Sequence, residues 1–269
     1  MKRCTWAGYL TGCPNMEIKI NKEKSVGKVL YIVEGSKTEP YLLWRIFAKV
    51  FDYQVETILR NHPYQKFNSK VNPTSQIFVI NTETSNIKTI AKDNDFLNNL
   101  FELLIENYDF DIDNTAIYYL FDRDCQSNTD QIFISNMINT LKNSRDNDGY
   151  ERQGMLLLSY PSIESFTLSN FETNSFCQRF DLGDTLKSYL ESKKINHARI
   201  NITTLTMAIQ EMMDALALIG VEAFDIDNFL NTNKAIFEYE EDVYSKESVY
   251  QALSLLCVSL IDLGLIEVT

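Results

Sequence analysis

KVLYIVEGSKTEPYLL, Lys28 to Leu43, carries the clearest structural signal in the chain. Its first half is a continuous run of β-branched, aromatic and aliphatic residues that ends in a glycine, which is typical of a strand buried on both faces of a parallel sheet. From Glu39 to Phe51 the apolar residues recur at helical spacing, with Thr38 available as an N-cap and Pro40 tolerated in the first turn. The stretch predicts a strand, a tight turn and a helix, with Glu34 at the carboxyl end of the strand.

Further apolar runs repeat this pattern along the chain. They cover Gln76–Asn81, Ala116–Phe121 and Gly154–Ser159, and helical patterns lie between them at Asp95–Tyr108 and Thr129–Ser144. Strands that alternate with helices favour a sheet with right-handed crossover connections. We therefore expect an α/β fold built on a parallel sheet of about four strands that is flanked by helices.

The two ends of the chain are predicted to differ from this core. Strand signals stop beyond about Asn170, and helical patterns cover Asn201–Gly220 and Val243–Leu263. We expect a core over residues 25–170 and a helical C-terminal region over 171–269 that packs on it. Residues 1–24 are interpreted as a disordered leader without the apolar centre of a secretory signal, so that Met1 and Met16 both remain open as the true start.

Composition restricts the classes of function. The chain has 269 residues and a formal net charge of −12, which argues against holding nucleic acid by bulk electrostatics; a nucleic-acid substrate would need a local patch, a metal or a partner. No apolar stretch approaches the ~20 residues of a membrane-spanning helix. The 5 cysteines are scattered without the spacing of a zinc site. We expect a cytoplasmic protein with reduced thiols and no membrane association.

Acidic residues follow several of the predicted strands. Glu34 ends the first strand, Asp122 and Asp124 end the third, and Glu164 follows the fourth. Ligands of open parallel sheets bind beyond the carboxyl ends of the strands, where these acids would meet. Grouped carboxylates repel one another, and Mg²⁺ or Mn²⁺ relieves that repulsion while it orients phosphate oxygens. Taken singly, each acid is also explained as a helix cap or a turn residue.

Three motifs in this region resemble those of a known family. VEGSKTEPYLL, Val33 to Leu43, is similar to the first motif of the Toprim nucleases of OLD-type (AriB-like) and RloB-like bacterial phage-defence proteins. FDRD, Phe121 to Asp124, resembles their DxD motif, and YPSIESF, Tyr160 to Phe166, resembles a later RloB-like segment. Four residues separate Glu34 from Glu39 where many OLD-type proteins have three. The resemblance covers roughly residues 28 to 170 and implies a Toprim fold with metal-dependent phosphodiester chemistry.

The resemblance also implies roles for individual acids. Glu34 would act as a general acid or base, or as a metal ligand. Asp122 and Asp124 would hold the cation that polarises the phosphate and activates a water molecule. Glu39 and Glu164 would complete a second metal position, and their match to the family pattern is the looser one.

Basic residues near these motifs are candidates for contact with substrate. Lys37 lies at the start of the helix, where free backbone amides favour an anion, and is our candidate for the scissile phosphate. Arg123 lies between the two aspartates and would offset their charge or touch substrate, unless it points to the other face of the sheet. Lys193 and Lys194 belong to the most basic part of the C-terminal region, which would follow a nucleic-acid backbone or form ordinary solvated surface.

The leading hypothesis is a metal-dependent endonuclease that cuts DNA or RNA, including tRNA, as the toxic effector of an antiviral defence system. A partner ATPase encoded alongside would hold or trigger it, and the chain itself could form a homo-oligomer. One alternative is a non-catalytic Toprim-like adaptor or sensor that binds a partner or a nucleotide. The other is a relative of topoisomerases or primases, for which the chain lacks an evident zinc ribbon or tyrosine-bearing cleavage domain.

Overall fold

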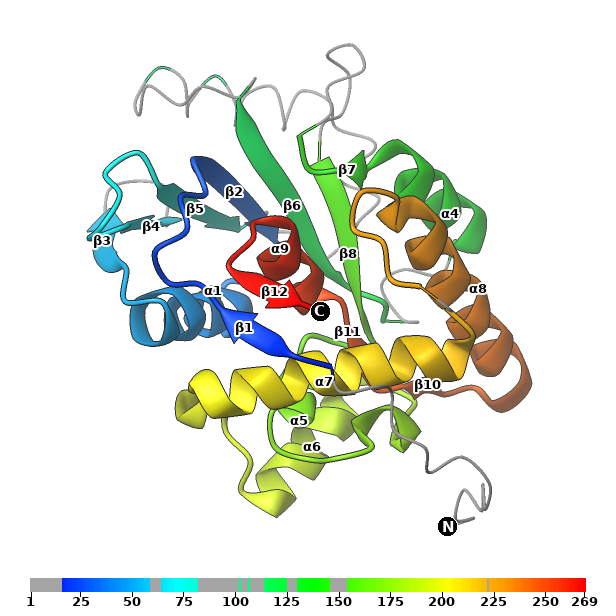
Figure 1. The fold of residues 1–269 in the computed structure, drawn as a ribbon. Helices are drawn as coiled ribbons and strands as arrows, with labels where there is room; N and C mark the ends of the chain where they lie inside the picture. Colours follow the sequence, from blue (N-terminus) through cyan, green and yellow to red (C-terminus); the bar gives the residue numbers. More distant parts are fainter. Residues whose placement is uncertain are drawn as a thin grey trace.

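The computed structural model of this chain describes residues 16–58, 64–81, 102, 106, 114–124, 130–145, 154–221 and 223–269. A mixed sheet forms its centre, with strands in the order β11–β8–β6–β2–β5–β4–β3 and with β7 paired to β8 (Figure 1). The strands of this sheet are β2 Lys28–Val33, β3 Gln54–Ile58, β4 Tyr64–Asn68, β5 Gln76–Asn81, β6 Thr115–Asp122, β7 Lys142–Asn143, β8 Gly154–Tyr160 and β11 Leu253–Ser254.

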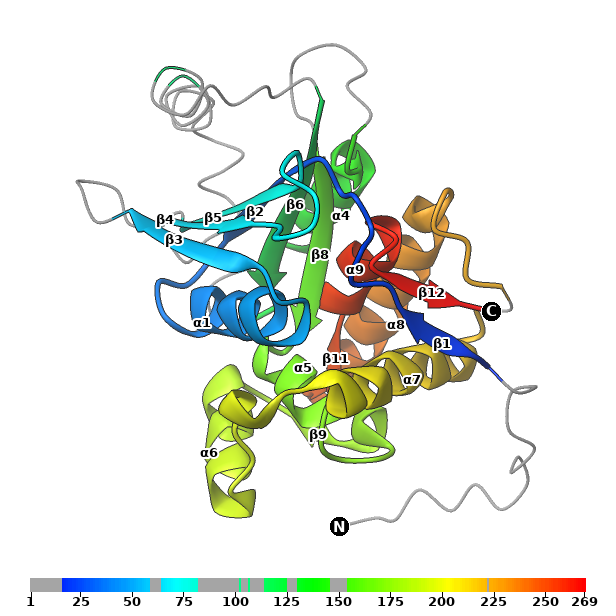
Figure 2. The same cartoon turned by 60° about the vertical axis from the view of Figure 1, so that its left-hand side comes forward.

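Helices cover both faces of the sheet. They are α1 Thr38–Trp44, which continues as a π-helix over Arg45–Val50, α4 Gln131–Thr140, α5 Glu164–Ser169, α6 Gly183–Lys193, α7 Ile202–Ile219, α8 Phe229–Glu247 and α9 Leu256–Asp262. Tyr118 in β6 donates a hydrogen bond to Asp262 of α9, whereas Arg123 just after β6 pairs with Glu241 of α8. Because side chains alternate along a strand, α9 and α8 lie on opposite faces. Figure 2 shows α9 and α8 from a second direction.

The predicted parallel strands are confirmed and adjoin one another. Strand β2 pairs in parallel with β5 on one side and β6 on the other, and β6 pairs in parallel with β8. Val29, Leu30, Tyr31, Ile32 and Val33 are 0% exposed, as expected for a strand that is covered on both faces. The carboxyl ends of β2, β6 and β8 consequently meet at one edge of the sheet.

The sheet extends beyond these four strands, and its outer pairings are antiparallel. Strand β4 pairs antiparallel with both β5 and β3, and β11 pairs antiparallel with β8. The sheet is therefore mixed and larger than the sequence predicts. The polar, alternating sequences YQKFN and QVETI of β4 and β3 lack the continuous apolar runs that identify the buried strands.

The helices before residue 170 agree with the sequence analysis in part. The helix expected from Glu39 to Phe51 is present, but Lys37 rather than Thr38 occupies the N-cap position. The expected helix Thr129–Ser144 is shorter: α4 is capped by the Asp130 side chain and ends at Thr140, and the next residues form β7 beside β8. The helix expected at Asp95–Tyr108 lies outside the described residues.

The prediction that strands stop after Asn170 is wrong. Strand β9 Arg179–Phe180 pairs with β10 Tyr250–Gln251, and β11 joins the main sheet. Val243–Leu263 is not a continuous helix, because α8 ends at Glu247, the next residue Ser248 is in the left-handed conformation, and α9 begins only after β11. The helix at Asn201–Gly220 is confirmed as α7, with an Asn201 capping box and a left-handed glycine at its end.

Part of the expected leader belongs to the folded structure. Residues 1–15 lie outside the described part, but β1 Ile18–Ile20 pairs antiparallel with β12 Ile266–Val268. The boundary expected near residue 170 stays a prediction. One buried apolar cluster nevertheless joins residues from both sides of it, including Tyr31, Phe166 and Leu256.

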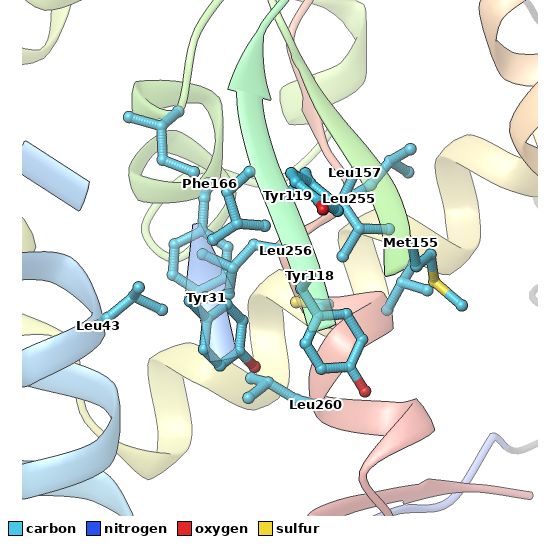
Figure 3. Close-up of a cluster of buried hydrophobic side chains, with 14 of the residues drawn as sticks. Tyr31, Leu43, Tyr118, Tyr119, Met155, Leu157, Phe166, Leu255, Leu256 and Leu260 are labelled. Carbon is cyan, nitrogen blue, oxygen red and sulfur yellow. The ribbon is translucent and has the colours of Figure 1, made fainter. Parts of the chain in front are cut away.

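The centre of this cluster lies between the sheet and α9 (Figure 3). Tyr31 of β2 and Tyr118 of β6 stack with ring centroids 5.2 Å apart, and both lie near Leu260 of α9. The Tyr31 hydroxyl donates a hydrogen bond of 2.9 Å to Ser259 Oγ, so that this buried polar group is satisfied. The last helix of the chain thus packs on strands that lie far earlier in the sequence.

Helix α7 is long and apolar enough to be tested as a membrane span. It has 18 residues with a mean hydropathy of 1.3, and no other helix in the described ranges meets both conditions. Leu205, Ile209 and Met212 on one of its faces are buried in the main core. Apolar residues of α7 are therefore used to pack this helix against the rest of the protein.

Replacement of Leu260 by alanine is expected to lower the free energy of unfolding by about 2–5 kcal/mol, because it leaves a cavity between α9 and the sheet. Leu260 is 0% exposed. Urea denaturation measures the change. Leu218→Ala on α7, where the leucine is 64% exposed, is the matched control and should change stability by no more than about 0.5 kcal/mol. Equal effects of the two replacements would contradict the packing of α9.

Candidate metal and phosphate site

The candidate site lies where β2, β6 and β8 end. Glu34 follows β2, Asp122 ends β6 and Asp124 lies two residues further on. Glu39 lies in the first turn of α1, and Glu164 begins α5. In Figure 1, α5 and α6 lie beyond the carboxyl ends of β6 and β8. Segments far apart in the sequence therefore bring all the acids that the sequence analysis singled out to one edge of the sheet.

A hydrogen bond joins the first two of these positions. The backbone N–H of Asp122 donates to Glu34 Oε2 at 2.8 Å. Glu34 is only 7% exposed. Its carboxylate thus links the ends of two neighbouring parallel strands, which fixes its position relative to Asp122.

The segment after β8 is held to the same edge. The backbone N–H of Ile163 donates to Asp122 Oδ1 at 2.7 Å, and the Ser162 hydroxyl donates to Glu164 Oε2 at 2.8 Å. Glu164 is 6% exposed. The Asp122 carboxylate therefore positions the start of α5, which carries Glu164.

Glu39 closes the turn between β2 and α1. Its Oε1 accepts a hydrogen bond of 2.9 Å from the backbone N–H of Gly35, and the residue is 6% exposed. A Cβ at position 35 would lie 2.5 Å from Glu39 Oε2. A side chain at position 35 would therefore displace the Glu39 carboxylate from this hydrogen bond, whereas glycine leaves it in place.

The acids perturb one another electrostatically. The pKa of Glu34 is raised to about 8, mainly by burial. The hydrogen bond from Asp122 lowers this pKa, and the charges of Glu39 and Asp124 raise it. Burial, followed by the charges of Glu34, Glu39 and Glu164, holds the pKa of Asp122 well above its usual value. Burial also raises the pKa of Glu39, and Glu164 adds to this shift. The Glu34, Glu39, Asp122, Asp124 and Glu164 side chains thus form one coupled group, which we call the acid cluster.

The donor chemistry of the acid cluster fits Mg²⁺ or Mn²⁺. All of its potential ligands are carboxylate oxygens, which hard cations prefer, and a cation would offset the repulsion that raises these pKa values. In the part of the chain that the structure describes, however, no three Asp, Glu, His or Cys side chains are already assembled as a metal site. A bound cation would therefore draw these carboxylate oxygens closer together than they lie in this structure.

A lysine that sequence reasoning did not place here borders the acid cluster. Lys187 of α6 has its Nζ 3.9 Å from Glu164 Oε1 and 3.5 Å from Asp184 Oδ1. Burial lowers the pKa of Lys187, but Glu164, Asp184 and Asp122 outweigh that effect and raise it overall. The available signal was the basic stretch that begins at Lys187, yet nothing in its spacing indicated contact with Glu164.

His197 approaches from the turn after α6. Its ring lies 5.0 Å from that of Tyr41 in an edge-on arrangement. Burial lowers the pKa of His197, and the charge of Glu164 partly opposes this. The neutral imidazole is therefore favoured at neutral pH, beside the acid cluster.

The predicted lysines have different surroundings. Lys37 is exposed at the start of α1, next to the Glu34–Glu39 turn, where a phosphate contact is open to it. Lys193 and Lys194 are exposed at the end of α6, and Lys193 Nζ lies 5.4 Å from the centre of the Tyr189 ring. Neither of these two lysines contacts the acid cluster in the part of the chain that the structure describes.

Arg123 does not face the acid cluster. It is 2% exposed and binds Glu241 of α8 through two hydrogen bonds, Nε to Oε1 at 2.7 Å and Nη2 to Oε2 at 2.9 Å. Its guanidinium also lies 5.6 Å from the centre of the Tyr250 ring. The expected role in substrate contact is therefore corrected: the alternation of side chains sends Arg123 to the opposite face from Asp122.

No family model, curated protein or solved structure matches this chain.

Replacement of Glu34 by glutamine is expected to stabilise the metal-free protein at alkaline pH. The pKa of Glu34 is about 8 in the folded protein, against an ordinary 4.5. Below pH 4.5 the carboxyl is protonated in both states and does not oppose folding. As the pH rises from 4.5 to 8, the unfolded state releases this proton more readily than the folded state, and the folded protein loses stability. Each tenfold difference in proton affinity corresponds to about 1.4 kcal/mol, which sets the benefit at a few kcal/mol.

Thermal unfolding in EDTA between pH 5 and 9 measures this effect. The difference between Glu34→Gln and wild type should grow with pH, while Glu191→Gln at an exposed position of α6 should track wild type throughout. Addition of Mn²⁺ should stabilise wild type more than Glu34→Gln. A difference that does not depend on pH would contradict the buried, protonated state of Glu34.

Proposed function

We propose that this chain is a metal-dependent nuclease of the Toprim type that hydrolyses phosphodiester bonds in DNA or RNA. The observation that carries the proposal is the acid cluster, in which five carboxylates from separate segments gather at the carboxyl edge of parallel strands and Glu34, Glu39 and Glu164 are buried. A protein keeps such a repulsive group where it serves chemistry, because each unneutralised buried carboxylate opposes folding. The motif resemblance around Val33–Leu43 and Phe121–Asp124 supports the same conclusion.

In this proposal Glu34, Asp122 and Asp124 hold Mg²⁺ or Mn²⁺, and Glu39 and Glu164 hold a second ion. A bound ion would polarise the phosphate and activate a water molecule. Glu34, with a pKa raised to about 8, is suited to exchange a proton near neutral pH. The hydrogen bonds from Asp122 and Ile163 backbone amides keep the carboxylates in place before substrate arrives.

Lys187 and Lys37 supply positive charge around the acids. Lys187 stays protonated because the neighbouring carboxylates raise its pKa, and it is half-exposed, so that it can reach a phosphate oxygen. Lys37 lies at the turn between β2 and α1. With a net charge of −12, the chain depends on such local cations to hold a polyanion.

The second candidate is a non-catalytic adaptor or sensor with the same architecture. The acids at all of the expected positions weigh against it, because a protein that only binds a partner does not need buried carboxylates at this edge. The family resemblance suggests two further features of the nuclease. It would act as a toxic effector of antiviral defence, and a partner ATPase would control it. Both candidates are compatible with a homo-oligomer.

Metal-dependent cleavage is the first test. Purified protein is incubated with plasmid DNA and with total tRNA in Mg²⁺, Mn²⁺ or EDTA. Cleavage is expected with metal only, and Glu34→Gln and Asp122→Asn should each reduce its rate by at least about 100-fold. The control Glu191→Gln should retain the wild-type rate. Binding of Mn²⁺ without cleavage of either polymer would favour the adaptor, and cleavage that survives both replacements would place the active site elsewhere.

Lys187 is expected to contribute through its charge. Lys187→Ala should lower kcat/KM for cleavage by about 10- to 100-fold, because a charge-assisted contact to phosphate is lost, while Lys187→Arg should retain more of the activity. Lys193→Ala, on the same helix, is the control and should stay within about twofold of wild type. Equal losses at the two positions would indicate general electrostatic attraction rather than a specific contact.

A further inference from the structure

Three aromatic rings form a partly exposed group at the rim of the acid cluster. Tyr41 of α1 is 39% exposed, and its ring lies 5.3 Å from Trp44 and 5.0 Å from His197. Tyr41 is two residues beyond Glu39 in the same helix. We call Tyr41, Trp44 and His197 the aromatic platform.

The aromatic platform is held together by contacts between distant segments. Arg45 Nη2 donates a hydrogen bond of 3.1 Å to the backbone oxygen of Ile200, which follows the His197–Arg199 turn. Lys49 Nζ lies 5.0 Å from the centre of the Trp44 ring. The first contact keeps the His197 turn beside α1, so that the arrangement of the rings is part of the fold.

The aromatic platform is continuous with the acid cluster. Glu164 acts electrostatically on His197 at one end. At the other end, the backbone N–H of Tyr41 donates to the backbone oxygen of Lys37 at 3.1 Å, which places the two residues one helical turn, ~5.4 Å, apart along α1. A cation for phosphate and a flat apolar surface therefore lie side by side next to the carboxylates.

We propose that the aromatic platform stacks against an unpaired nucleobase next to the scissile phosphate, so that the substrate is single-stranded or locally unpaired nucleic acid. This inference rests on the proposed nuclease function and specifies its substrate class. A nucleotide has a charged phosphate, which matches the lysine, and a base with a flat π-face, which matches the aromatic rings. In a regular duplex the faces of the bases are covered by their neighbours and cannot reach Tyr41.

The charge of the chain supports the same substrate class. With a net charge of −12, neutralisation of many phosphates along a duplex is not available as the main source of affinity. Stacking on aromatic side chains does not depend on net charge, and it tolerates any base because every base has a π-face. The aromatic platform thus supplies a grip that an acidic protein can use.

The test measures binding rather than cleavage. The full chain carrying Glu34→Gln, which is expected to leave the probe uncut, is titrated in Mg²⁺ against fluorescent 12-nucleotide single strands of DNA and of RNA and against their duplexes. Fluorescence anisotropy gives the Kd. Tyr41→Ala should weaken single-strand binding by about 5- to 100-fold, Tyr41→Phe should stay within about twofold, and Tyr41→Leu should lie near Tyr41→Ala. Ile132→Ala, at a 77% exposed residue of α4, is the control and should change nothing.

A second measurement asks whether Tyr41 meets a base. A series of single strands is used, each of which lacks the base at one position. Removal of the base at one of these positions should weaken binding as much as Tyr41→Ala does. In the Tyr41→Ala variant, removal of that base should cause no further loss. Thermal unfolding of each variant checks that the fold is intact.

The possible failures are distinguishable. Single-strand binding that Tyr41→Ala leaves unchanged, or that Tyr41→Leu retains in full, would overturn the stacking inference while metal-dependent cleavage upholds the nuclease. Tighter binding of duplex than of single strands would overturn it as well. Absence of both binding and cleavage for every nucleic acid would remove the proposed function together with the inference.

Discussion

The parallel pairing of β2 between β5 and β6 is the constraint on which the rest of the structure depends. Lys28 lies opposite both Gln76 and Thr115, so that the three strands run in the same direction. Parallel strands end at the same edge of the sheet. The chain must therefore return along one face of the sheet to the opposite edge before the next parallel strand begins. Glu34 and Asp122 are neighbours in space for this reason, although they are 88 residues apart in the sequence.

The site combines this geometry with an electrostatic conflict. A fold that needed only stability would not bury Glu34, Glu39 and Glu164 together, which are 7%, 6% and 6% exposed. The backbone N–H groups of Gly35, Asp122 and Ile163 each donate one hydrogen bond to a carboxylate of the cluster. These N–H groups are uncharged, so they position the carboxylates without neutralising them. The carboxylates are thereby fixed near one another while part of their repulsion remains, and a cation or a proton is the natural means to reduce it.

The sequence was sufficient to predict the strands at the centre and the acids at their ends, because buried parallel strands are long apolar runs and their carboxyl ends are marked by Glu34 and Asp122. It was insufficient for β11, which has two residues and owes its structure to pairing with β8. Residue spacing also could not show that Lys187 reaches Glu164, since that contact depends on how α6 packs. The direction of Arg123 was open at the end of a strand, and the partner that decides it, Glu241, lies 118 residues away.

The pair formed by Arg123 and Glu241 has a consequence for how this protein can vary. One tripeptide, Asp122 to Asp124, serves the site with its outer residues and the opposite face with its middle one. Loss of the guanidinium alone would leave the buried Glu241 without this ion pair, and loss of Glu241 alone would remove the acceptor of two hydrogen bonds from the buried Arg123. Replacement of both residues by apolar ones is therefore expected to destabilise the fold less than replacement of either one alone.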